Sequence, residues 1–401
     1  MALAGEKVGI PSADEAPMIV MARYKQPLAG ILALLIIFII SIVSWWVFFD
    51  PRWWWHSHEL VPYASVIGGF GLIGVVWAIW FENWPYYNWF RTPWKVGLVG
   101  TGINAVIILI FTLLLLPLFQ SFYCPSPFNE YIGWYASASI FGALSGSLFS
   151  FAVLWVAGTM YWPFFKIKQP KRGIIVWIIG MAITLLAWLF LFFPNGNCSA
   201  PITQLAVKGI YFPLPNYPFS LGWTQYIIFF SLLTMMVFEY WPWNKLGRKQ
   251  PFMGMIAAAV CVILGLIIAL FQGFIGEYIF DPIFVLLGGI PPADPFERIT
   301  GQYYMVISYA IFLICAVVVV SLFFDNWPKK YTQWKNFIIR FLIVFFLGTG
   351  GFFGFYLLSP FVFGEPNNFW NINATPFVLL FLWIEILFAY VWRKWPIYKA
   401  V

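Results

Sequence analysis

Long apolar runs separated by short polar segments make up the sequence from residue 28 onward. The runs lack the alternation of a transmembrane β-strand, and each can cross a bilayer as a helix, because one crossing takes about 20 residues. The pattern predicts ten helices, over residues 28–49, 60–82, 96–119, 133–160, 173–193, 221–240, 253–275, 300–324, 335–358 and 375–392. We therefore expect an all-α polytopic integral membrane protein, with a tail at 1–27 and a single transmembrane domain at 28–401.

The dipeptide Trp-Pro closes every second apolar run. It comprises Trp84 and Pro85, Trp162 and Pro163, Trp241 and Pro242, Trp327 and Pro328, and Trp395 and Pro396, so the repeats end near 85, 163, 242, 328 and 396. With 24 Trp and 28 Pro in 401 positions, chance would give only about two such pairs. Gaps of 78, 79, 86 and 68 residues between the Trp fit two crossings plus their connections. The repeat predicts five sequential helical hairpins, each closed by a Trp-Pro corner.

Composition restricts the class of protein further. Hydrophobic residues make up 62% of the chain and charged residues 9%, so a water-compatible surface cannot be built. The net charge of +7 comes from cations in short connections rather than on one continuous surface, which argues against nucleic acid as a partner.

The positions of the cations predict the orientation. If the amino terminus and the five corners lie on one side, that side holds 19 of the 22 Lys and Arg residues, and the other side holds Arg52, Lys208 and Arg298. The positive-inside rule then places both termini in the cytoplasm, in a plasma or cytoplasmic membrane.

The corners combine an interfacial Trp with a helix-ending Pro. Glu82, Glu239 and Asp325 stand two residues before the Trp, where a helix C-terminus disfavours a carboxylate without a cation partner. We expect partners nearby in sequence: Arg91 or Lys95, then Lys245, then Lys329 or Lys330. Interface anchoring explains the motif most simply, and a docking surface for a partner protein is the alternative.

Within the apolar runs one carboxylate stands apart from the helix ends. Glu385 lies eight residues before Arg393, about 12 Å along the helix and near the bilayer midplane. Such a group is costly and indicates proton transfer, cation binding or ligand contact; a carboxyl hydrogen-bonded to a neighbouring helix is the structural alternative. The corresponding positions of the other repeats hold Gly74, Ala152, Ser231 and Val317, so Glu385 is not part of the repeated scaffold.

Other side chains give weaker signals. Small residues on the predicted fourth helix indicate close helix packing, and they are Ser139, Gly142, Ala143, Gly146, Ser147 and Ser150. Cys124 and Cys198 fall in external loops, where a disulfide is an open alternative. His56 and His58 form a weak metal candidate without a third ligand fixed by spacing, so we expect no metal site there.

Two functions remain open. The first is a scaffold or subunit of a membrane complex, whose aromatic-rich bundle holds lipid, quinone or another apolar ligand and docks partner proteins or further copies of itself. The alternative is a secondary transporter or permease that uses Glu385 as a proton- or cation-coupling carboxylate. No haem, iron–sulfur, nucleotide or catalytic motif is evident, so we expect no enzyme on this chain alone; a lipid-modifying enzyme would lack a recognisable catalytic set. We favour the scaffold, because the helices carry little of the polar lining that a water-filled path requires.

Overall fold

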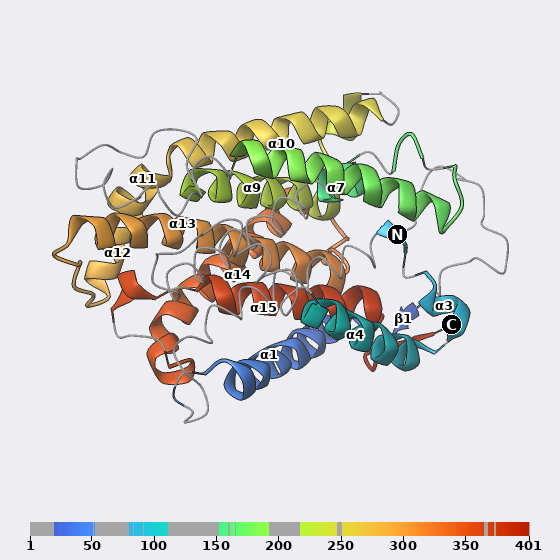
Figure 1. Cartoon of the computed structure of the whole chain (residues 1–401), viewed down its shortest axis with the longest axis horizontal. Helices are drawn as coiled ribbons and strands as arrows, with labels where there is room; N and C mark the ends of the chain where they lie inside the picture. Colours follow the sequence, from blue (N-terminus) through green and yellow to red (C-terminus); the bar gives the residue numbers. More distant parts are fainter. Residues whose placement is uncertain are drawn as a thin grey trace.

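Helices dominate the computed structural model of the chain (Figure 1). The structure describes residues 20–50, 52, 80–82, 84–90, 92–110, 152–158, 161–164, 166–191, 217–246, 251–364, 368–372 and 374–400. Within them, six helices are long and apolar enough to cross a membrane, and a shorter apolar helix covers Thr375–Val391. Integration into a membrane follows, since about 20 apolar residues suffice for one crossing. The predicted helices at 60–82 and 133–160 lie largely outside the described residues, so the count of ten stays a prediction.

The helices that enter the corners continue into π-helical turns, written η. The α-helices are α1 (Leu28–Phe48), α3 (Tyr86–Trp89), α4 (Pro93–Ile110), α7 (Lys171–Leu191), α9 (Tyr217–Leu232), α10 (Phe252–Leu270), α11 (Gln272–Ile275), α12 (Asp281–Leu286), α13 (Pro295–Val318), α14 (Gln333–Val362) and α15 (Thr375–Ile386). The π-helical segments are η3 (Val153–Gly158), η5 (Leu233–Val237), η7 (Gly276–Phe280), η8 (Val319–Phe323) and η10 (Leu387–Val391). The 3₁₀ turns are η6 (Trp243–Leu246) and η9 (Phe369–Asn371).

The described spans fall into an inner and an outer class. Inner helices lead into a corner, and the spans Phe219–Val237 and Glu297–Phe323 are each 83% buried. Outer helices follow a corner, except α1, which precedes the first one; in their most apolar stretches only 22% of α1, 28% of α10 and of α14, and 33% of α4 is buried. The outer helices therefore present most of their apolar surface to lipid, whereas the inner helices form the core.

Each outer helix faces the core along one narrow strip. In α10 the buried residues are Gly254, Ala257, Cys261, Gly265 and Ala269, at spacings of three or four. In α1 they are Ala29, Ala33, Ile37, Ser41 and Trp45, at intervals of four, together with Gly30. These spacings keep the residues on one side of a helix, and small side chains let the helices approach closely.

Inner helices pack beside one another, and the outer helices α1, α10 and α14 each cover a junction between two of them. The inner segments are in contact in the order η3, α9, α13 and α15. Helix α10 contacts α9 and η3, helix α14 contacts α13 and η5, and helix α1 contacts α15 and η8. Helix α1 therefore lies against the last two inner helices just as α14 lies against the two before them.

The corners share one backbone conformation. The amide groups of Phe238, Phe324 and Trp392 each donate to the carbonyl five residues earlier, closing a π-helical turn. Left-handed residues then precede the Trp, with φ of 52° at Glu239 and 63° at Tyr240 in the third corner. All five Trp-Pro peptide bonds are cis.

The two ends of the described chain meet beside the corners. Strand β1 (Val20–Ala22) pairs antiparallel with β2 (Tyr398–Ala400), with Met21 opposite Lys399. The apolar pattern gave no indication of this pair, because three residues are too few for a period of two to show. It holds the start of α1 next to the segment that follows the fifth corner.

Away from the corners the core is filled by aromatic rings. Phe284 of α12 packs on Phe352, Phe353 and Tyr356 of α14, with ring centroids 5.0 to 6.1 Å apart. Phe377 of α15 contacts Phe363 at 4.3 Å. Such edge and tilted contacts are the preferred geometry of aromatic pairs. The high Phe content thus serves packing inside the bundle as well as contact with lipid.

Candidate functional site

The corner carboxylates bind cations from other repeats. Glu82 pairs with Arg172 at 2.7 Å, Glu239 with Arg340 at 3.4 Å, and Asp325 with Lys394 at 3.2 Å. The expectation of partners nearby in sequence is wrong for Lys95, Lys245, Lys329 and Lys330; Arg91 lies outside the described residues. The reason is the left-handed backbone before each Trp, which directs the carboxylate toward an adjoining segment instead of along its own helix.

A glutamine at the start of an outer helix fastens that helix to a corner. The Nε2 atom of Gln26 donates to the carbonyl of Phe323 at 2.8 Å, and its Oε1 accepts from the amide of Gly30 at 3.2 Å. Gln169 repeats both contacts, with the carbonyl of Trp80 at 3.0 Å and the amide of Gly173 at 3.1 Å. Phe323 and Trp80 each stand four residues before the Trp of their corner. The contact is therefore part of the repeat.

Arginine takes the place of this glutamine at the third corner. Arg340 of α14 donates from Nη1 to the carbonyl of Val237 at 3.0 Å, and Val237 also stands four residues before its Trp. The same nitrogen lies 3.4 Å from the Glu239 carboxylate, and Nη2 donates to the Pro328 carbonyl at 3.3 Å. Only 4% of Arg340 is exposed, and these acceptors offset part of the cost of burying the cation, whose Nε has no acceptor among the described residues.

A glycine near the start of the outer helix lets an aromatic ring of the corner pack directly against the helix backbone. Seen from Gly30, the nearest atoms belong to the ring of Phe324, and a Cβ there would overlap it. The ring of Phe81 stands in the same way over Gly173, and that of Trp392 over Gly97. Each ring belongs to the residue three before the corner Trp. Three outer helices thus meet three corners through the same glycine–ring contact.

The left-handed residues indicate that the corner side chains themselves are needed. This conformation costs roughly 1–2 kcal/mol for a residue other than Gly, which would adopt it freely. Yet Glu82, Glu239, Asp325 and Arg393 occupy it, with φ between 49° and 52°. The ion pairs of the three acids provide the compensating interaction, because a glycine would make none.

Asp325 has the most extensive set of partners. Its carboxylate accepts from the Tyr398 hydroxyl at 2.7 Å and from Gln26 at 2.9 Å, besides pairing with Lys394. Burial alone would raise the pKa of Asp325, but the Lys394 ammonium and these two donors outweigh it, so the pKa lies below its ordinary value. Burial lowers the pKa of Lys394, against the opposing effect of Asp325. This network joins the fourth corner, the fifth corner and α1.

Corners that follow one another in sequence also touch. Asn326 of the fourth corner donates to the Met236 carbonyl at 2.9 Å and to Glu239 of the third corner at 3.3 Å. Lys394 of the fifth corner occupies the place of Asn326 and binds Asp325 of the fourth. In the fourth and fifth corners, the residue just before the Trp therefore contacts the acid of the preceding corner.

Glu385 is the second candidate site. It is fully buried on α15, and neither carboxyl oxygen makes a hydrogen bond of ordinary geometry. The polar group that interacts with its carboxyl is the Cys315 thiol of α13. At the corresponding position of the third repeat, Ser231 is also fully buried, and the Cys261 thiol of α10 is its polar neighbour. Two repeats thus place a buried polar group beside a thiol at corresponding positions.

At the end of the bundle away from the corners, a second buried acid is fully paired. Asp281 of α12 accepts from Arg298 at 2.8 Å, from Gln302 at 2.7 Å and from the Trp370 indole at 2.8 Å. It fastens α12 to the start of α13 and to the segment before α15. We assign Asp281 a structural role, since its lone pairs are occupied by the protein itself.

Several sequence-predicted residues lie outside the described part of the chain. They are His56 and His58, Cys124 and Cys198, and the small residues Ser139, Gly142, Ala143, Gly146, Ser147 and Ser150. Within the described residues, Cys261 and Cys315 are buried free thiols.

A short sequence motif marks the glutamine contact, although the apolar pattern does not indicate it. Gln-Pro-x-x-Gly occurs at residues 26–30, 169–173 and 250–254, each time at the start of an outer helix. Its three copies complement the Trp-Pro repeat and would have indicated the cross-repeat contacts.

Comparison with family models, with curated proteins and with solved structures finds no match for this chain. The geometry above therefore carries the functional argument by itself.

Proposed function

We propose that this protein is a scaffold or subunit of a membrane complex, built from ten helices in five sequential hairpins that close into a ring. Inner helices form the core and outer helices cover the junctions between them, as the contacts of α1, α10 and α14 indicate. The first helix covers the junction between the last two inner helices, which joins the start of the transmembrane domain to its end. A closed, interlocked frame suits a protein whose task is to hold other components in place.

The observation that carries this proposal is the bonding of three corner acids to other repeats. Glu82, Glu239 and Asp325 all bind groups outside their own repeat. Such ties restrain the hairpins from sliding past one another, whereas the rocking of one half against the other in a transporter requires an interface free to move. Loss of the ties should loosen the frame without changing its covalent topology.

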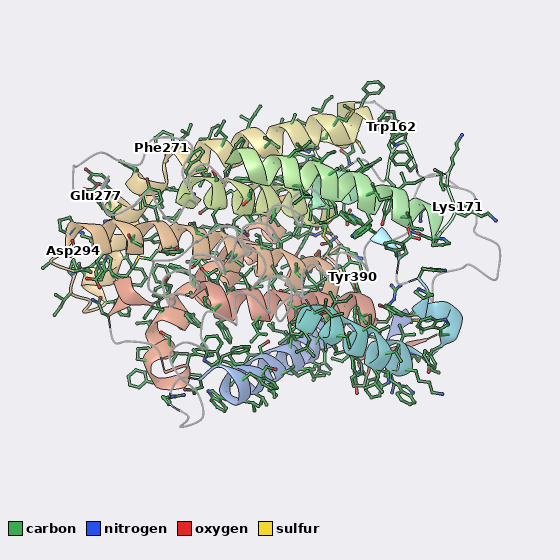
Figure 2. All side chains as sticks on the ribbon, viewed as in Figure 1. Trp162, Lys171, Phe271, Glu277, Asp294 and Tyr390 are labelled. Carbon is green, nitrogen blue, oxygen red and sulfur yellow. The ribbon has the colours of Figure 1, made fainter. Side chains whose placement is uncertain are left out.

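We place the corners and both termini on the cytoplasmic side. Lys171 and Trp162 lie at one end of the bundle, and Asp294 and Glu277 lie at the other (Figure 2). Arg52 belongs to the far end, where its guanidinium binds the carbonyls of Phe361 and Val362 as α14 finishes. The excess of cations at the corner end supports the orientation through the positive-inside rule.

The proposed apolar ligands, lipid or quinone, would bind on the outer faces. The rings of the described core pack on one another, as Phe284 and Phe377 show, and this packing leaves the outer helices as the available apolar surface. Partner proteins would dock on the corner end, where Trp162, Trp327 and Trp395 are 36% to 44% exposed. Exposed Trp is characteristic of both interfaces and membrane surfaces.

Purification of the native protein in lipid nanodiscs tests the proposal. Mass spectrometry of the intact particle should show stoichiometric protein partners or further copies of the chain, together with bound lipid or quinone. Trp327→Ser, at 43% exposure, should release a partner docked at the corners, whereas Trp334→Ser, which removes a 51% exposed indole outside the corner motif, should not. A lone chain with no partner, able to move a solute across a vesicle membrane, would contradict the scaffold.

Glu385 favours a second function, coupled transport. Its buried carboxyl has no ionic partner within the described residues, and its burial on an inner helix suits a group that exchanges a proton. In vesicles, Glu385→Gln should abolish any proton-coupled flux that the native protein supports. Glu277→Gln, which alters an acid at the far end of the bundle, serves as the control. If neither version supports flux, this second function is excluded.

A further inference from the structure

Beyond α10 the chain exposes apolar side chains where a water-facing connection would expose polar ones. Helix α11, segment η7 and helix α12 follow one another from Gln272 to Leu286, and the chain turns at Gly288, where φ is 91°. Gln272, Gly276, Phe280 and Phe284 recur at intervals of four and are buried. The opposite side is exposed and apolar, formed by Phe271, Phe274, Tyr278, Ile279, Val285, Leu286, Leu287 and Ile290.

Exposure is extreme at the end of this segment. Leu286 is 85% exposed and Ile290 is 80% exposed, while most outward-facing residues of α1 lie between 40% and 60%. Between Phe271 and Ile290 the charged residues are Glu277, which is half-buried, and Asp281, which is buried and paired. A helix that faced water would carry its charges on the exposed side, so water is not the medium that this side fits.

The depth of the segment follows from its contacts with α13. Gly273 lies beside Tyr303, Gly276 beside Gln302, and Asp281 binds Arg298. At 1.5 Å per residue, Tyr303 is about 30 Å and Arg298 about 38 Å from the corner end of that inner helix at Phe323. The hydrocarbon core is about 30 Å thick, and headgroups extend the bilayer to about 40–45 Å. The segment therefore slants through the headgroup layer of the leaflet opposite the corners.

We propose that α11, η7 and α12 form an interfacial anchor whose exposed apolar row is immersed in that leaflet. The occupant of the surface is lipid, because the row continues the exposed apolar face of α10, where Ile263, Ile267 and Leu270 meet acyl chains. An interfacial helix of this kind buries its apolar side about 5–10 Å into the boundary between headgroups and acyl chains. In Figure 2, Phe271 and Glu277 mark this end of the bundle, opposite Trp162.

The anchor is rigidly attached to the core. Asp281 on its buried side holds the start of α13 and the Trp370 indole, and Phe284 packs among the rings of α14. Lipid contact at Leu286 and Ile290 therefore fixes the depth of the inner helix α13. The anchor depends on membrane integration alone and stands whichever of the two proposed functions holds.

Spin labels in nanodiscs test the anchor directly. Labels are attached at Leu286→Cys and Ile290→Cys, with Cys124 and Cys198 replaced by Ser, and collisions with oxygen and with a water-soluble nickel chelate are measured. Ile263→Cys, on the lipid-facing side of α10, and Asp294→Cys, at the polar end, provide the matched controls. We expect the labels at 286 and 290 to be accessible to oxygen and at least threefold less accessible to nickel than the label at 294.

Two results would overturn the anchor. Nickel accessibility at 286 and 290 equal to that at 294 would place the row in water. Shielding from both reagents in native membranes, with loss of label mobility, would show that a protein covers it. Neither result affects the label at 263, so the failure of the anchor is distinguishable from a failure of membrane integration.

Discussion

The side-chain amide of Gln26 donates a hydrogen bond of 2.8 Å to the backbone carbonyl of Phe323, a residue 297 positions further along the chain. Gln169 makes the same bond to Trp80, 89 positions earlier. The same contact thus joins an outer helix to a later corner in one case and to an earlier corner in the other, as expected if the repeats close into a ring. The first outer helix, α1, packs against the inner helices that lead into the fourth and fifth corners.

The glutamine contacts should stabilise the fold measurably. Gln26→Leu and Gln169→Leu each remove a donor from a half-buried carbonyl and an acceptor from a glycine amide, and each should lower the free energy of unfolding by about 1–3 kcal/mol. Unfolding in mixed detergent, followed by circular dichroism, measures the change. Gln333→Leu, at the exposed start of α14, should leave it unaltered. An equal decrease in the free energy of unfolding at all three positions would show that Gln26 and Gln169 have no special role.

The glycine–ring contacts predict a clear difference between glycines. Gly30→Ala and Gly173→Ala introduce a Cβ that overlaps the rings of Phe324 and Phe81, and each should cost about 1–3 kcal/mol. Gly102→Ala, on α4, meets no atom within 4 Å and should stabilise slightly through helix propensity. Thermal unfolding of the three variants in one detergent provides the comparison. A destabilising Gly102→Ala would show that the helices as a whole do not tolerate the extra methyl group.

Asp325 should make stability depend on acid. Its pKa is lower in the folded state than in the unfolded chain, so the ionised carboxylate stabilises the fold above its ordinary pKa of about 4, and this contribution is lost as pH falls through the lower, folded value. The Asp325→Asn variant should be less stable at neutral pH and should lose less stability on acidification. Unfolding at a series of pH values between 3 and 7 tests this on both proteins. Parallel curves for the two would mean that Asp325 is not the responsible group.

The closed arrangement predicts that the chain tolerates circular permutation. Val20 pairs with Ala400 in the strand pair, so a short Gly/Ser linker can join them, and new ends can be opened between the exposed residues Lys329 and Lys330. This permutant should insert into the membrane and purify as a single species on size exclusion. Opening the chain inside α13, between Ile314 and Cys315, should abolish folding. Failure of both permutants would argue against closure through α1 and the two strands.

The sequence predicts the helices of this fold better than their contacts. Apolar length locates α1, α10 and α14 within a few residues, because a bilayer imposes the same length on every span. The Trp-Pro recurrence locates the corners, since each Pro ends a helix. The π-helical turns and left-handed residues have no residue signature comparable to glycine, so the corner backbone was not predictable.

The predicted ion partners of the corner acids were wrong for a related reason. We chose Lys245 for Glu239 because the two lie close along the chain, yet the backbone between them turns the carboxylate toward Arg340, 101 residues away. Glu385 was predictable as a buried group from its apolar neighbours. Its thiol neighbour Cys315 was not, because that contact depends on how two inner helices are rotated against each other.

Thiol cross-linking between α1 and the corners tests the closed arrangement most directly. In a background with Cys124 and Cys198 replaced by Ser, Gln26→Cys is combined with Asp325→Cys or with Glu239→Cys, the equivalent acid of the third corner, and treated in nanodiscs with a short bifunctional thiol reagent. The structure predicts efficient cross-linking within one chain between 26 and 325, where the native Nε2 of Gln26 lies 2.9 Å from the Asp325 carboxylate, and a lower yield between 26 and 239. Cross-linking of 26 to 239 with equal yield, or no cross-link to 325, would contradict the account.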